Sequence, residues 1–117
     1  MKFTFKDKEY EFHYSQRIHM MFERIQGYSI DFNNLTNEDH NVLAYVCFLA
    51  TLQYNKVYEA VDYIDFLNWV DDNGNSKFML DFSAWFITAM EHEYDLIKSD
   101  IKEEDLKKIE SEIEKKA

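Results

Sequence analysis

The stretch NVLAYVCFLATLQY, residues 41–54, is apolar on nearly every side of a helix, and it decides how the rest of the chain folds. A helix that is apolar all round needs other elements to cover it on all sides. Thr36 and Asp39 precede the stretch with a spacing that resembles a capping box. We therefore expect a central buried helix that starts after Thr36. Its Cys47, the single cysteine of the chain, is expected to be a small buried apolar residue.

The N-terminal segment alternates apolar and polar residues, which is typical of a β-strand with one buried face. The alternation occurs in KFTF, residues 2–5, and in EYEFHY, residues 9–14, with the polar KDKE as the turn. We therefore expect a β-hairpin. Because an isolated hairpin is marginally stable in water, its aromatic face should pack on helices. The residues of this face are Phe3, Phe5, Tyr10, Phe12 and Tyr14.

A first helix is expected between the hairpin and the central helix. Ser15 can cap its N-terminus, and Gly27 is placed to end it. The apolar residues between them recur at helical spacing. These residues are Ile18, Met21, Phe22 and Ile25. The segment YSIDFNNL, residues 28–35, then indicates a loop.

Two more helices are expected after the central one. Asp62 can cap a helix that ends at Asp72, and Ser76 can cap a long helix over residues 76–98. In helical projection one broad face of the long helix is apolar. The residues of this face are Phe78, Phe82, Trp85, Phe86, Ala89, Met90 and Ile97.

The composition changes after Tyr94, beyond which the chain has no aromatic residue. Residues 99–117 pair glutamates with lysines four positions later, which favours a solvated helix. We expect a core domain over residues 1–98 and a charged C-terminal helix over 99–117, either docked or partly detached. Its narrow apolar stripe offers a surface for a homo-oligomer. The stripe consists of Leu106, Ile109 and Ile113.

These patterns predict an α+β protein that is mostly α-helical. An N-terminal β-hairpin packs on a bundle of about four helices and a charged C-terminal helix follows. With 46% hydrophobic and 17% aromatic residues, the 117-residue chain has enough apolar surface to form a core. No apolar run reaches the roughly 18 residues of a membrane helix, and the N-terminus does not have the pattern of a signal peptide. We therefore expect a cytoplasmic protein.

Negative charge is concentrated in the middle of the chain. The formal net charge is −10, and residues 31–72 hold eight acidic residues but one basic residue, Lys56. Nucleic acids and anionic membranes both attract basic surfaces, so neither is expected as a partner. A basic protein partner is compatible with this charge.

No pattern of catalytic or metal-binding residues emerges. The four histidines lack the spacing that places two metal ligands on one helical face. DDNGNS, residues 71–76, resembles a calcium loop, but Ser76 replaces the required glycine and Phe82 the required glutamate. With two glycines the chain has no phosphate-binding loop. We expect neither an enzyme nor a metal or other cofactor. The histidines are His13, His19, His40 and His92.

The segment DFLNWVDDN, residues 65–73, combines aromatic rings with carboxylates. Phe66 and Tyr63 lie within the apolar arc of this helix, whereas Trp69 projects between Asp62 and Asp65 at the edge of the acidic face. Two interpretations of Trp69 follow. It either covers the hairpin or the fourth helix at the edge of the core, or it is a contact hot spot for a partner.

The order of elements resembles that of the small tail assembly chaperones of long-tailed, siphovirus-like bacteriophages. The resemblance covers roughly residues 3–92 and has no counterpart for the tail after residue 98. Its motifs consist of core and capping residues and include no catalytic group. The matching segments are MKFTFKDKEYEFHYSQR (1–17), IHMMFERIQGYSID (18–31), the buried helix, YIDFLNWVDDN (63–73) and FSAWFITAMEHE (82–93).

The resemblance implies a non-catalytic protein that binds the helical tape measure protein and helps recruit tail tube protein around it. Such a protein works in the cytoplasm of the infected bacterial host and is not expected in the mature virion. A client helix needs apolar rings and a charge of suitable sign. We therefore expect an exposed aromatic and methionine patch on the third and fourth helices, with an acidic rim. The candidate contact residues are Asp62, Tyr63, Asp65, Phe66, Trp69 and Phe86.

Two alternatives remain open at this point. The net charge of −10 is compatible with a small acidic inhibitor that imitates nucleic acid and blocks a basic host protein. Such a mimic binds with a steep salt dependence, whereas a chaperone depends on its aromatic residues. An unrelated adaptor of the host cytoplasm is the other alternative.

Overall fold

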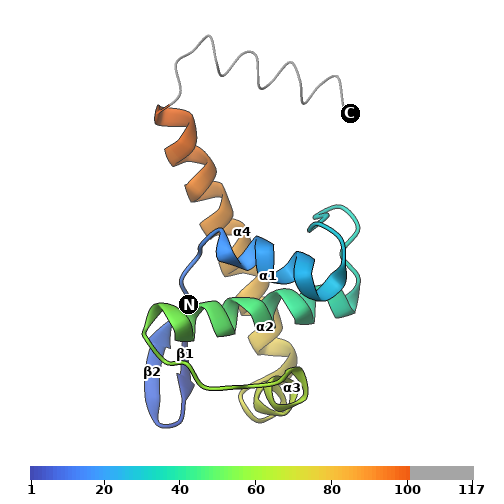
Figure 1. The fold of residues 1–117 in the computed structure, drawn as a ribbon, viewed down its shortest axis with the longest axis vertical. Helices are drawn as coiled ribbons and strands as arrows, with labels where there is room; N and C mark the ends of the chain where they lie inside the picture. Colours follow the sequence, from blue (N-terminus) through green and yellow to red (C-terminus); the bar gives the residue numbers. More distant parts are fainter. Residues whose placement is uncertain (101–117) are drawn as a thin grey trace. The chain divides into compact units, whose positions relative to one another are not determined.

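The computed structural model describes the backbone of residues 1–100 and the side chains of residues 1–93. Within these residues a hairpin is followed by four helices, which confirms the predicted α+β, mostly α-helical class (Figure 1). The chain divides into two units, Met1–Phe86 and Ile87–Ala117, and the packing described below is that of the first. The elements are β1 (Lys2–Phe5), β2 (Lys8–Glu11), α1 (Arg17–Gln26), α2 (Asn37–Tyr54), α3 (Tyr63–Asp72) and α4 (Asn75–Asp100).

The predicted hairpin is present, with β1 and β2 antiparallel and Phe3 opposite Tyr10. Lys6 and Asp7 form its turn with φ of 49° and 64°. Two successive residues with positive φ give the tight two-residue turn whose twist matches that of the strands. Phe3, Tyr10 and Phe12 are buried. The hairpin therefore turns its aromatic face inward, as predicted, although Phe5 and Tyr14 are only half-buried and β2 ends at Glu11.

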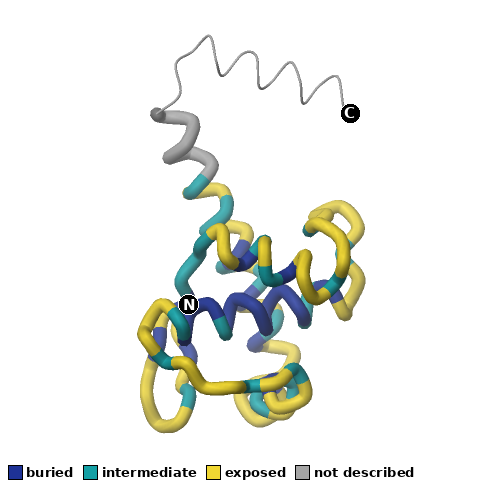
Figure 2. The backbone as a smooth tube through the Cα atoms, viewed as in Figure 1, coloured by how far each residue is buried: buried dark blue, intermediate teal, exposed yellow. Residues whose placement is uncertain are grey.

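α2 is the centre of the first unit, with α1 on one side and the hairpin and α3 on the other (Figure 1). The predicted capping box is confirmed: the Asp39 N–H donates to Thr36 Oγ1 at 3.1 Å, and the Thr36 N–H donates to Asp39 Oδ2 at 3.1 Å. Residues 42–48 are all buried (Figure 2). The central part of the apolar stretch is thus covered on every side, whereas Tyr54 at its end is exposed.

Aromatic rings hold the hairpin on the helices. Phe3 lies 5.1 Å from Phe48 of α2 and 5.8 Å from Trp69 of α3, measured between ring centroids. Phe12 lies 5.5 Å from Phe82 of α4. Rings at these separations interact favourably beyond the burial of their area. The prediction that the hairpin packs on helices is confirmed.

The other helix boundaries follow the predicted signals in part. α1 ends at Gly27, which has φ of 80° and donates its N–H to Glu23 O at 2.8 Å, as expected for a glycine after a helix. α3 is capped by Asp62 and runs to Asp72, as predicted. On α4, Phe78, Phe82 and Phe86 recur every four residues and are buried, which confirms this part of its apolar face.

Two predicted caps are wrong. α1 begins after Gln16, whose backbone is already helical, and the side chain of Ser15 does not cap it. α4 begins at Asn75, one residue before Ser76. Gly74 and Asn75 have φ of 108° and 46°, so the chain turns within two residues and Ser76 falls inside the first turn of the helix.

The predicted charged helix over residues 99–117, with Leu106, Ile109 and Ile113, lies outside the residues whose side chains are described. Its docking and its part in a homo-oligomer stay predictions. No helix in the described part of the chain is both long and apolar enough to span a membrane.

Candidate protein-binding surface

The N-terminus of α3 carries two of the predicted contact residues. Asp62 accepts a hydrogen bond from the Asp65 N–H at 2.7 Å and thereby caps the helix. Both residues are exposed. A carboxylate at this end of a helix is also favoured by the helix dipole. Asp62 thus has a structural role, while its exposed side leaves negative charge available to a partner.

Two tyrosines lie beside these carboxylates. The Tyr45 hydroxyl donates to Val61 O at 2.6 Å, and its ring packs on Tyr63 at 5.4 Å. Burial first, and then the charges of Asp62 and Asp65, raise the pKa of Tyr45. Burial and Glu38 raise the pKa of Tyr63. Both phenols therefore keep their protons in a region of negative potential.

Trp69 covers the hairpin at the edge of the core, which is the first of the two interpretations above. Its indole Nε1–H donates to Thr4 O at 3.2 Å. The ring is half-buried and lies 5.8 Å from Phe3, 5.1 Å from Phe48 and 5.1 Å from Phe78. Trp69 therefore joins β1, α2 and α4 to α3. Its replacement by alanine would remove structural contacts together with any contact to a partner.

The predicted exposure of Phe66 and Phe86 is wrong. Phe66 is 0% exposed and Phe86 is 2% exposed. Phe66 points toward α2, where it packs on Tyr45 and Phe48, and Phe86 packs on Phe32 of the loop before α2. These two rings therefore belong to the core. Contact of Asp62, Tyr63, Asp65 and Trp69 with a partner stays a prediction.

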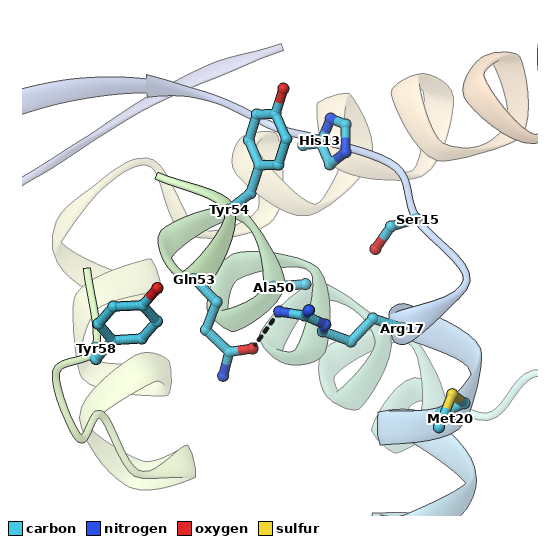
Figure 3. A pocket seen from close by; sticks show the side chains of 8 residues that line it. All are labelled: His13, Ser15, Arg17, Met20, Ala50, Gln53, Tyr54 and Tyr58. Carbon is cyan, nitrogen blue, oxygen red and sulfur yellow. Dashed lines mark hydrogen bonds between the residues drawn. The ribbon is translucent and has the colours of Figure 1, made fainter. Parts of the chain in front are cut away.

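An exposed aromatic and methionine patch does occur, but at a different place. Met20 of α1, Tyr54 at the end of α2 and Tyr58 in the following loop are exposed, Tyr58 to 77%. They border a hollow of about 670 Å³, which we call the tyrosine pocket (Figure 3). Its lining residues are His13, Ser15, Arg17, Met20, Ala50, Gln53, Tyr54 and Tyr58.

Specific contacts order the wall of the tyrosine pocket. The His13 ring stacks on Tyr54 at 3.8 Å between centroids with an interplanar angle of 10°. The His13 N–H donates to Oγ1 of the buried Thr51 at 3.0 Å, which fixes the chain before α1 against α2. Arg17 reaches across the pocket and donates from Nη1 to Gln53 Oε1 at 2.9 Å (Figure 3). These contacts join the chain before α1, and α1 itself, to α2, and so they hold the wall of the pocket in place.

The loop that carries Tyr58 is also tied down. Lys6 of the hairpin turn forms an ion pair with Glu59. The Val57 N–H donates to Leu52 O at 2.8 Å, which attaches the start of this loop to the end of α2. Exposed ion pairs contribute little to stability, but this pair and the backbone bond restrict the positions available to Tyr58.

Sequence reasoning missed the tyrosine pocket because Tyr54 appeared as the last residue of a helix buried all round. Tyr58 stood in a segment without helical or strand periodicity. One signal was present: an aromatic residue in a polar loop has no amphipathic face to join and is a candidate for an exposed contact.

A second hollow of about 550 Å³ lies between α2 and the first half of α4. Two of its lining side chains, Met79 and Leu80, are apolar, but unlike the tyrosine pocket it is lined, among the described residues, by no tyrosine ring. The other lining residues are Asn37, His40, Asn41, Asn75, Ser76 and Ser83.

Among the described residues, no three side chains of histidine, cysteine, aspartate or glutamate are placed to hold a metal ion. Cys47 is buried, as predicted, and burial raises the pKa of its thiol well above the usual value. A thiol in this setting is a poor nucleophile. Desolvation, partly offset by Glu23, lowers the pKa of His19.

Comparison of the chain with protein-family models, with curated proteins and with solved structures gave no match.

Proposed function

We propose that this protein is a non-catalytic tail assembly chaperone of a long-tailed bacteriophage. It binds a helical segment of the tape measure protein and assists the assembly of tail tube protein around it in the cytoplasm of the infected host. The observation that carries the proposal is the tyrosine pocket with exposed Met20, Tyr54 and Tyr58 on an acidic chain. The order of hairpin, helices and acidic aromatic segment supports it as a resemblance.

The tyrosine pocket suits an amphipathic helix. Tyrosine is enriched among residues that dominate binding energy, since its ring offers a large, rigid contact area. Methionine adapts its shape to different apolar side chains. A helical client would place apolar residues three or four positions apart into such a hollow. Several copies along one long client would raise the avidity without any new contact.

The acidic face of α3 has a second role in this proposal. Asp62 and Asp65 are exposed and lie close to Tyr63 and Tyr45, whose pKa values respond to nearby carboxylates. Surface charge of this kind steers oppositely charged partners and selects among them. We therefore assign the choice of a lysine-rich client to this face and most of the binding energy to the tyrosine pocket.

We expect Tyr58→Ala to weaken client binding about tenfold or more, as for a contact hot spot. Its side chain is 77% exposed, so the fold should be unaffected. The measurement is a co-expression pull-down with the product of the longest open reading frame beside the gene, followed by titration of the purified proteins. Leu80→Ala, at 72% exposure on α4, is the control. Undiminished capture by Tyr58→Ala would contradict the proposal.

The acidic nucleic-acid mimic is the second candidate function, and the concentration of carboxylates between residues 31 and 72 favours it. We expect the double variant Asp62→Asn, Asp65→Asn to slow association of the client, with a smaller effect on dissociation. Asparagine also caps helices well, so α3 should persist. Stopped-flow kinetics at low and high salt measures the effect. A loss of affinity in this variant that exceeds the loss in Tyr58→Ala would favour the mimic.

A further inference from the structure

We infer that the tyrosine pocket binds a carboxylate that lies next to apolar side chains on an acidic peptide segment of the client, with Arg17 as the anchoring residue. The inference rests on the proposed function for the identity of the partner. The net charge of the chain suggests a preference for basic partners, whereas this pocket would select an acidic segment of the partner.

The charge of the pocket contrasts with that of the chain. The chain carries −10, yet in the part that the structure describes no carboxylate lines the tyrosine pocket. Arg17 is its charged residue. Glu59, which follows Tyr58, is engaged by Lys6. A local cationic site on an anionic protein is therefore open to a negatively charged group.

The hydrogen bonds of Arg17 support the same conclusion. Within residues 1–93 its guanidinium is bonded to a neutral amide oxygen, Gln53 Oε1, and forms no ion pair with a carboxylate. A guanidinium carries five N–H donors in a planar fork that matches a carboxylate. The bond to Gln53 uses one nitrogen and holds the fork across the pocket (Figure 3). The remaining donors are available to an incoming carboxylate.

The surroundings of Arg17 specify what accompanies the carboxylate. Tyr54 and Tyr58 present aromatic rings, and Met20 and Ala50 add apolar surface. An ion pair that is shielded by such groups is stronger than one in open water. A glutamate or aspartate between apolar residues would bind both Arg17 and the apolar lining of the pocket. A lysine at the same place would be repelled by the positive charge of Arg17.

Three short peptides test this inference directly. The probes are acetyl-Phe-Glu-Phe-amide and its versions with glutamine or lysine in place of glutamate. Binding is measured on the full chain through NMR shifts of the Arg17 Nε–H and of the backbone amides of Gln53 and Tyr54. We expect the glutamate peptide to bind about tenfold more tightly than the glutamine peptide, the range of a charge-assisted hydrogen bond, and the lysine peptide to bind most weakly.

The control compares two arginines of the same helix. Arg17→Gln should abolish the preference for glutamate over glutamine, whereas Arg24→Gln, which makes the same change in net charge at an exposed site, should keep it. Equal binding of the two peptides by the unmodified chain, tightest binding of the lysine peptide, or no shift with the glutamate peptide at millimolar concentration would each overturn the inference.

Failure here and failure of the proposed function give different results. If the peptides show no preference for glutamate but Tyr58→Ala still loses the client, the carboxylate specificity alone is wrong. If the glutamate preference depends on Arg17 but no helical client is captured, the pocket has the inferred chemistry and the chaperone function is wrong.

Discussion

Replacement of Phe48 by alanine is expected to lower the free energy of unfolding by about 3–5 kcal/mol, the range for removal of a buried phenylalanine. Phe48 is fully buried on α2 and lies between 5.1 and 5.2 Å from the rings of Phe3, Phe5, Phe66 and Trp69. The variant would leave a cavity where the hairpin, α2 and α3 meet. Small proteins have total stabilities of about 5–15 kcal/mol, so this variant would lose a large fraction of its stability.

Urea unfolding followed by circular dichroism measures this loss. Phe48→Leu keeps more of the apolar volume and should cost less than Phe48→Ala. Leu80→Ala, on an exposed site, should stay within about 0.5 kcal/mol of the unmodified chain. A loss for Phe48→Ala as small as that of Leu80→Ala would show that Phe48 does not join these elements.

The second large effect concerns Asp39 and pH. The Asp39 carboxylate is buried and accepts hydrogen bonds from Tyr28 Oη at 2.5 Å, Gln26 Nε2 at 2.6 Å and the Thr36 N–H at 3.1 Å. These bonds, with that from Tyr28 the largest contribution, lower the pKa of Asp39 to about 2. They join the end of α1, the following loop and the start of α2.

The direction of the pH dependence follows from this pKa. The folded value lies below the ordinary value of 3.8, so the charged carboxylate stabilises the fold above pH 4. This contribution is lost as the pH falls from about 4 through the folded value near 2. We expect Asp39→Asn to lower Tm at pH 7, and the difference from the unmodified chain to shrink as the pH falls from about 4 through 2.

Thermal melting of both proteins at a series of pH values checks this expectation. Asp81→Asn removes the same charge from an exposed site and is the control. The hydrogen bond to Asp39 also raises the pKa of Tyr28. The stability due to this pair should therefore fall again as the pH rises past 10, the ordinary value for tyrosine. A Tm difference for Asp39→Asn that is constant across the acidic range would refute the role assigned to the carboxylate.

Periodicity predicted the elements because it reports directly on which face of an element is apolar. It therefore indicated α2, the hairpin and the phenylalanines of α4. Side-chain caps were predicted well where the bonding partner lies within the same turn, as for Thr36 with Asp39. The caps predicted at Ser15 and Ser76 were wrong because a side chain can cap a helix only if the backbone before the helix has the required conformation. Gln16 is already helical, and the turn at Gly74 starts α4 one residue before Ser76.

The binding surface was harder to predict, since a helical projection shows which face is apolar and does not show which face is covered. Phe66 and Phe86 appeared as contact residues, but α2 and the loop before it cover them. The tyrosine pocket combines residues 13–20 with residues 50–58, which meet only after α1 has packed on α2. No local pattern contains that information.

The hydrogen bond from Trp69 to Thr4 joins residues 65 positions apart, and it has a consequence for synthesis on the ribosome. The hairpin leaves the exit tunnel before α2 and α3 exist to cover it, although a hairpin alone is only marginally stable. Phe3 gains its full cover only after Phe48 and Trp69 have been translated, and Phe12 only after Phe82. The hairpin is therefore made before the helices that cover it, and a truncated chain that ends before α3 would display an uncovered aromatic face that favours aggregation.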